Sequence, residues 1–153
     1  AQGTKAGQVV RMEFASPTAF LSSGLEISLP LPGQVFRSLW AKWNAFCPET
    51  MQVQDFWPQF AEKCFFVSEM TAVNTVHWVF AEGMRGKATG FTGTVAFFLP
   101  AKRALPEEWR EYTEGAAEVM QSLAQFAFYA GVGHHSTIGM GQVRLLSPST
   151  SSR

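Results

Sequence analysis

The sequence predicts an α+β fold, a four-stranded antiparallel sheet with two helices on one face. Two periodicities lead to this prediction. Apolar residues alternate with polar ones in three segments, as in strands, and recur every three to four residues in two others, as in helices. A further segment, rich in Val, Thr and Phe, is also expected to be a strand. These segments follow one another as strand, helix, strand, strand, helix, strand. That order is ferredoxin-like, the split βαβ arrangement that RNA-recognition motifs share.

The first half of the chain supplies one strand and one helix. Alternation over residues 9–14 predicts the strand, which Ser16-Pro17-Thr18 is expected to end. A long loop rich in Pro and Gly then leads to Pro32, with a short strand expected near residues 25–29. Apolar residues at helical spacing predict an amphipathic helix over 33–46. These residues are Val35, Phe36, Leu39, Trp40 and Trp43.

The second half supplies a hairpin, a helix and a closing strand. Segments 64–80 and 91–99 are separated by a basic, Gly-rich stretch, which predicts a β-hairpin with a basic tip and a bend near Asn74. Pro106 and the acids after it predict a helix start, and the apolar face continues for about six turns to Ala130. Gly131 ends this helix, and the alternation around Val143 predicts the last strand.

Length and composition fit one globular domain. A chain of this size buries about 68–70% of its unfolded surface. The 153 residues are 46% apolar and include 14 Phe and 5 Trp, which excludes disorder of the whole chain. We expect a flexible N-terminus over 1–8, one ferredoxin-like domain over 9–146 and a flexible tail over 147–153. Because the chain begins with Ala1 rather than Met, we expect it to be a fragment or a processed product.

Charge and cysteine usage limit the function. Twelve Lys and Arg balance 12 Asp and Glu, so no global positive field attracts nucleic acid, and any such contact must be local. Cys47 and Cys64 stand in neither a zinc-binding nor a Cys-x-x-Cys spacing, which predicts reduced thiols in a cytoplasmic protein. No apolar stretch approaches the roughly 20 residues needed to span a bilayer, so we expect no membrane association.

The leading candidate site is the segment from Gly131 to Gly141, Gly-Val-Gly-His-His-Ser-Thr-Ile-Gly-Met-Gly. Its glycines indicate two tight bends that frame a small platform. Backbone N–H groups and donor side chains suit phosphate oxygens, so a polyanion, first of all RNA, is the expected ligand. The candidate RNA-binding residues are Gly131, Gly133, His134, His135, Ser136, Thr137, Gly139 and Gly141. Alternatively, the glycines serve only as a turn that lets the second helix pack on the sheet.

Other ligands fit this segment less well. Ser136 stands where the Gly-x-Gly-x-x-Gly fingerprint needs Gly, and no Gly-Lys-Ser/Thr follows, so we expect no nucleotide cofactor. The adjacent side chains of His134 and His135 are expected to diverge, which argues against a joint metal site. His77, in an apolar strand, is expected to be a core or sheet-face histidine rather than a functional one.

Basic residues elsewhere are further candidates for RNA contact. Arg85 and Lys87, at the predicted hairpin tip, are expected either at the base of an RNA stem or in solvent. Arg144, which follows the glycine segment closely, is a weaker candidate. Arg37 and Lys42, on the polar side of the first helix, are weaker candidates.

The glycine segment also resembles a known signature. The run from Gly131 to Val143, after a helix ending Phe-Ala-Phe-Tyr-Ala, is similar to the glycine-rich signature that closes the CRISPR repeat-RNA endoribonucleases. These proteins, the sixth CRISPR-associated protein family, belong to the repeat-associated mysterious protein (RAMP) superfamily. Further similar segments extend the resemblance over nearly the whole chain, at residues 14–20, 29–32, 35–39, 43–46 and 90–95.

This resemblance implies recognition and processing of CRISPR repeat RNA. A full protein of the family usually has two ferredoxin-like domains, and this chain is similar to the second. Family cleavage is metal-independent: a ribose 2′-hydroxyl attacks the adjacent phosphate and leaves a 2′,3′-cyclic phosphate. Because the acid–base groups usually come from the first domain, no catalytic residue is assigned to His77, His134 or His135. We expect this chain alone to be inactive.

Two other functions stay open. A non-catalytic RNA-binding or assembly subunit of a CRISPR effector complex would use the same fold and loop, as related RAMP proteins do. A protein-interaction domain would instead pair its exposed sheet face with a second copy. The expected partners are therefore CRISPR repeat RNA, an N-terminal ferredoxin-like domain of the same protein, and effector-complex subunits or a second copy. No cofactor is expected.

Overall fold

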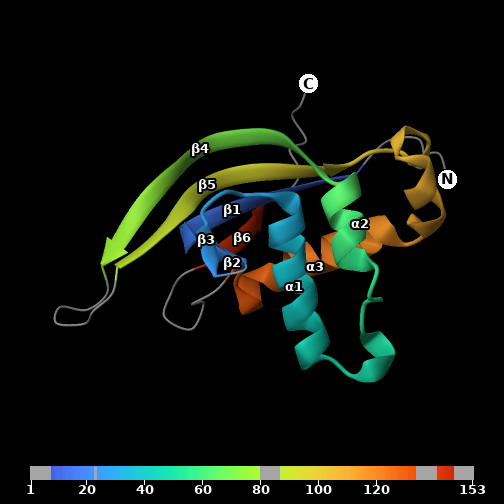
Figure 1. The fold of residues 1–153 in the computed structure, drawn as a ribbon, viewed down its shortest axis with the longest axis horizontal. Helices are drawn as coiled ribbons and strands as arrows, with labels where there is room; N and C mark the ends of the chain where they lie inside the picture. The colour runs from blue at the N-terminus through green and yellow to red at the C-terminus, as the bar shows by residue number, and fades with distance from the viewer. Residues whose placement is uncertain (1–7, 23, 80–86, 134–140, 147–153) are drawn as a thin grey trace.

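A computed structural model describes residues 8–22, 24–79, 87–133 and 141–146. Its main sheet is four-stranded and antiparallel, with the strand order β4-β5-β1-β6. Figure 1 shows the helices on one face of this sheet. The strands are β1 (Gln8–Thr18), β4 (Phe66–Val79), β5 (Lys87–Leu99) and β6 (Val143–Leu146), and the α-helices are α1 (Pro32–Phe46), α2 (Trp57–Cys64) and α3 (Ala116–Ala130). In chain order, β1 and β5 are the first and third strands of this sheet, and they lie in its middle. The predicted ferredoxin-like fold class is therefore confirmed.

Strand β1 runs further than the sequence predicts. Its apolar positions point into the core and its charged positions lie on the opposite face, as the alternation predicts. The predicted end at Ser16-Pro17-Thr18 is wrong, because the strand continues through Thr18. Its pairing with β5 is irregular between Phe14 and Thr18, so the missing N–H of Pro17 interrupts no regular ladder there.

The segments on either side of α1 hold more structure than expected. Before α1 lies a small two-stranded sheet of β2 (Phe20–Ser22) and β3 (Leu25–Ile27), of which the sequence predicts only the second strand. After α1 come a 3₁₀ turn, η2 (Glu49–Met51), and helix α2, where a connection and the start of a strand were expected. Pro58 suggested a loop, yet it stands in the first turn of α2, where proline costs no helical hydrogen bond.

The second half confirms the predicted hairpin and corrects the helix. Strands β4 and β5 pair, with an irregularity between Thr71 and Asn74 near the predicted bend. The predicted helix start at Pro106 is wrong. Two 3₁₀ segments, η3 (Lys102–Ala104) and η4 (Glu107–Tyr112), come first, and α3 begins at Ala116. Gly115 adopts a left-handed φ of 76°, which separates η4 from α3.

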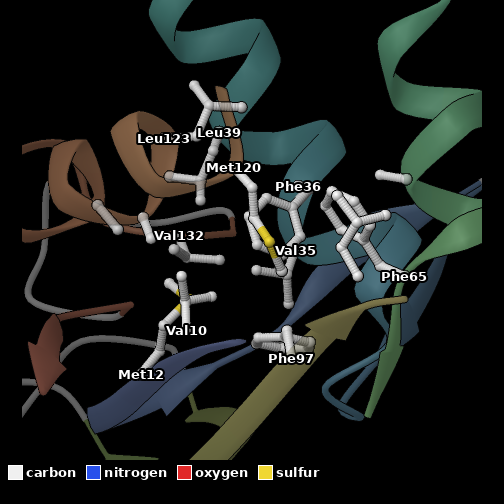
Figure 2. Close-up of a cluster of buried hydrophobic side chains, with 14 of the residues drawn as sticks. Val10, Met12, Val35, Phe36, Leu39, Phe65, Phe97, Met120, Leu123 and Val132 are labelled. Atoms are coloured by element: carbon white, nitrogen blue, oxygen red, sulfur yellow. The ribbon is translucent and has the colours of Figure 1, made fainter. Parts of the chain in front are cut away.

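The core fills the space between the sheet and the helices (Figure 2). The ring of Phe36 makes near-perpendicular contacts with Phe65 and Phe97, at centroid distances of 5.0 and 5.4 Å. Val132, which stands between two glycines after α3, is fully buried in the same cluster as Val10. Its burial anchors the start of the glycine segment to the core.

Candidate nucleic-acid interface

The glycine segment, residues 131–141 and hereafter the glycine loop, begins and ends at neighbouring points. The Val132 N–H donates to the carbonyl of Gly141, with N and O 2.9 Å apart. The Gly141 N–H in turn donates to the carbonyl of Pro17 at 2.9 Å. The next residue, Gln142, donates its N–H to the Ser16 hydroxyl at 2.9 Å. These bonds close the base of the glycine loop against the end of β1.

Close backbone packing explains two glycines at this base. Gly133 and Gly141 both have left-handed φ values, +83° and +75°. A Cβ atom at Gly133 would collide with the carbonyl of Ala19, and one at Gly141 with the carbonyl of Val132. Gly131, the C-cap of α3, also has a positive φ, of 76°. These glycines therefore serve the packing role that the sequence left open, and RNA contact at them stays a prediction.

Helix α1 holds the start of the glycine loop from the other side. The Ser38 hydroxyl accepts a hydrogen bond from the Gly133 N–H at 2.9 Å. One turn later, the Lys42 ammonium donates to the carbonyls of Gly131 and Gly133, at 3.2 and 3.0 Å. Burial lowers the pKa of Lys42 below its ordinary value. Lys42 therefore points toward the protein backbone, although the sequence placed it on the polar side of the helix.

A groove lies beside the glycine loop, between β2 and α1. Its lining residues are Phe20, Leu21, Gln34, Arg37, Ser38, Ala41 and Gly133. The Arg37 side chain is exposed and has no acidic partner within the described part of the chain. Because the lining includes no Asp or Glu, the groove presents one positive charge next to the glycine loop. From the sequence alone Arg37 was a weaker candidate, because helical spacing does not show which strand or loop a side chain faces.

Arg144, another of the weaker candidates from the sequence, is paired with an acid. Its guanidinium lies 2.7 Å from the carboxylate of Glu13, directly opposite on β1. On the same sheet, Arg11 pairs with Glu69 at 2.8 Å. A nearby carboxylate offsets the attraction of each of these cations for phosphate. Arg37 is therefore better placed than Arg144 to meet an anion.

Several predicted site residues lie outside the described residues. They are His134, His135, Ser136, Thr137, Gly139 and Arg85. For Lys87 and His77 the backbone is described: Lys87 pairs with Val79, and His77 with Thr89, in the hairpin of β4 and β5. The roles expected for all of these residues stay predictions.

The described residues offer donors rather than a metal site at this position. Within residues 8–22, 24–79, 87–133 and 141–146, no cluster of three His, Cys, Asp or Glu side chains could hold a metal ion. In the same part of the chain, no helix is long and apolar enough to cross a membrane. The polar side chains that line the groove are the Gln34 amide, the Ser38 hydroxyl and the Arg37 guanidinium, which can donate hydrogen bonds to an anionic ligand.

Comparison with known proteins identifies the family. The family model of the CRISPR-associated endoribonuclease Cas6 matches residues 12–143, from β1 through the glycine loop to β6. The chain belongs to the Cas6 family. This result confirms the resemblance seen in the sequence.

Individual Cas6 proteins are also similar to this chain, in sequence or in fold. The curated CRISPR-associated endoribonuclease Cas6 of Mycobacterium tuberculosis is 27% identical over 135 residues, which are 88% of this chain and 38% of the relative. A Cas6 (TTHA0078) product complex has a TM-score of 0.68 at 27% identity, over 91% of this chain and 51% of that chain. Thermus thermophilus Cas6 (TTHB231), at 24% identity, shares the fold with a TM-score of 0.73, over 95% and 57%. The chain thus spans about two fifths to just over half the length of these relatives.

Proposed function

We propose that this chain is the RNA-binding C-terminal half of a cytoplasmic Cas6 endoribonuclease, and that the glycine loop contacts CRISPR repeat RNA. Similar solved structures include a Cas6 product complex and a Cas6 substrate mimic complex, which supports this class of ligand. The observation that carries the proposal is the closed base of the glycine loop, with the exposed Arg37 beside it.

The chemistry around the loop fits an RNA backbone. Arg37 can donate two parallel N–H bonds to one phosphate, a geometry that its planar guanidinium favours. Leu21, 62% exposed in the same groove, offers an apolar contact for a base or ribose. Because the chain has a net charge of zero, such local contacts must supply the affinity. His134 and His135 are proposed to add donors from the glycine loop.

We propose further that cleavage needs the remainder of the parent protein. The matched region is 38% of the curated relative and 51% of the chain in the product complex, which leaves room for an N-terminal ferredoxin-like domain. In the proposed reaction a ribose 2′-hydroxyl attacks the adjacent phosphate, and the 5′-oxygen of the next nucleotide leaves. The products are a 2′,3′-cyclic phosphate and a 5′-hydroxyl, formed with acid–base groups of that other domain. This chain alone is then inactive.

Binding of a CRISPR repeat RNA by variants of the chain tests the proposed interface. We expect the double variant His134→Ala, His135→Ala and the single variant Arg37→Ala each to weaken binding by about tenfold, roughly one strong contact. The control is the double variant Lys102→Ala, Arg103→Ala in η3. It removes two exposed cations from a segment that contacts η4 and does not line the groove beside the glycine loop.

The parent protein separates the remaining outcomes. If neither the chain nor the parent binds the RNA at low salt, where phosphate contacts are strongest, the proposal is wrong. Binding by the parent alone would show that the loop needs its partner domain. Cleavage by the parent, with no cleavage by this chain, is the expected result. A parent that binds without cleaving would favour the non-catalytic subunit instead.

A further inference from the structure

The ammonium of Lys42 lies where α3 ends and the glycine loop begins. It donates to the carbonyls of Ala130, Gly131 and Gly133 at 3.4, 3.2 and 3.0 Å. The last carbonyls of a helix lack partners within the helix and carry its negative dipole end, so a cation there is stabilising. Lys42 comes from α1, 88 residues away from Ala130 in sequence, and thereby joins two helices at the start of the loop.

One peptide unit links this contact to the closure of the loop. In a trans peptide the carbonyl and the N–H point in opposite directions, and no described peptide bond is cis. The carbonyl of Gly131 faces Lys42, and the N–H of the same peptide, from Val132, donates to Gly141 at 2.9 Å. Lys42 therefore fixes the orientation of the peptide that holds the two ends of the loop together.

The next peptides are held in the same way. Gly133 donates its N–H to the Ser38 hydroxyl and accepts at its carbonyl from Lys42. Ser38 and Lys42 are four residues apart, so they lie on the same side of α1. A glycine has no side chain to restrict its φ and ψ, so these two bonds set the direction in which the chain leaves Gly133.

We infer that Lys42 is a positioning residue of the RNA site: its ammonium orients the first peptides of the glycine loop and does not itself contact RNA. Lys42 lines a hollow together with Phe46, Phe126, Tyr129 and Ala130, and none of these residues carries a carboxylate. The RNA part of this inference rests on the proposed function. The effect on the loop is measurable in the free protein.

Hydrogen exchange of the free chain tests the loop without RNA. In Lys42→Met, which keeps the length of the side chain but removes the donors, we expect the amides of Val132 and Gly133 to exchange at least about tenfold faster, as local opening becomes easier. Amides of β1 should be unchanged. The matched control is Lys63→Met, the same change at an exposed lysine of α2. Unchanged exchange at Val132 and Gly133 would overturn the inference.

A salt series of RNA binding separates positioning from contact. Loss of one phosphate contact lowers the slope of log affinity against log salt by roughly 0.7–0.9. We expect that change for Arg37→Ala, whereas Lys42→Met should weaken binding of the repeat RNA about tenfold with the slope unchanged. A lower slope for Lys42→Met would mean that Lys42 meets phosphate, which also overturns the inference.

Two outcomes remain: the Lys42→Met variant does not fold, or the wild type does not bind RNA. If Lys42→Met does not fold, Lys42→Gln replaces it, and its exchange rates at Val132 and Gly133 should lie above those of the wild type. Rates equal to the wild type would contradict the inference. If the wild type binds no RNA at any salt concentration and neither does the parent, the proposed function fails, and the exchange result alone decides whether Lys42 orients the loop.

Discussion

Glycine is favoured in this protein for two different reasons: a left-handed backbone angle and the lack of space for a Cβ atom. Gly133 and Gly115 have similar left-handed φ values, +83° and +76°. A Cβ atom added at Gly115 would have no neighbour within 4 Å, whereas at Gly133 the carbonyl of Ala19 occupies that position. Gly115 is thus favoured for its backbone angle alone, and Gly133 for angle and space together.

Alanine substitution measures this difference. We expect Gly115→Ala to lower the free energy of unfolding by about 1–2 kcal/mol, the cost of a left-handed residue with a Cβ. Gly133→Ala should cost about 1–3 kcal/mol more, because the neighbouring backbone must also move. Urea unfolding of both variants gives the two values. Equal losses of unfolding free energy would show that the backbone at Ala19 moves away from the added Cβ without an energetic cost.

Cys64 provides a pH dependence of stability. Burial, and to a lesser extent the charge of Glu108, raises the pKa of this thiol from 9.0 to about 11. Between these pH values the unfolded chain releases the thiol proton and the folded chain keeps it, so the free energy of unfolding falls as pH rises. Compared with Cys64→Ala, the wild type should therefore lose relative stability between pH 8 and pH 10.5. Urea unfolding at both pH values checks this, and a constant difference would contradict it.

The roles of the charged side chains at the site could not be predicted from the sequence. Spacing placed both Arg37 and Lys42 on the polar side of α1, and Arg37 is exposed there, whereas Lys42 is partly buried against the end of α3. Spacing could not distinguish their roles, because exposure of Arg37 and the carbonyl contacts of Lys42 depend on segments far away in the sequence. The pairing of Arg144 with Glu13 likewise depends on strand register, which no single segment encodes.

The connection between α1 and α2 is organised by side chains of the helix before it. Asn44 bonds both backbone groups of Val53: its amide donates to the carbonyl at 2.9 Å, and its oxygen accepts from the N–H at 2.8 Å. The Trp40 indole donates to the same carbonyl at 3.1 Å. The Trp43 indole donates to the carbonyl of Met51 at 2.9 Å. These hydrogen bonds hold the irregular connection between α1 and α2 in one conformation.

Removal of the Asn44 amide should loosen this connection. We expect Asn44→Ala to cost about 2 kcal/mol, roughly 1 kcal/mol for each hydrogen bond. For a domain of this size the melting temperature should fall by about 4–8 °C. The control is Gln52→Ala, which removes one exposed bond in the same segment and should change stability by less than about 0.5 kcal/mol. A similar melting temperature for both variants would be evidence against this role of Asn44.

Long, periodic elements were predictable and short ones were not. The pattern over 33–46 gave α1 to within one residue, and the alternation of β5 gave the hairpin. Helix α2 was missed because its eight residues are too few for a clear helical period and contain Pro58. The helix expected from Pro106 was too long because Trp109 and Tyr112 fit its apolar face, although Gly115 interrupts the chain before α3.

Across the domain, the described face of the sheet opposite the helices combines charge pairs with an apolar row. Val9, Phe98 and Phe66 lie opposite one another on three neighbouring strands, and Val9 and Phe66 are 39% and 50% exposed. Arg11 and Arg144 are each paired with a carboxylate. The balanced composition predicted that nucleic-acid contacts would have to be local, and under the proposed function the groove at Arg37 is such a local site.

The closed base of the glycine loop has a consequence for how specificity can change. Because the Val132–Gly141 bond, the contact of Gly141 with Pro17 and the buried Val132 side chain secure both ends, the residues between them can differ in number and kind while the scaffold stays the same. Under the proposed function, the domain would then hold an exchangeable recognition segment between two fixed ends. If the glycine loop contacts RNA as proposed, replacing that segment would change the RNA preference without a change in the fold.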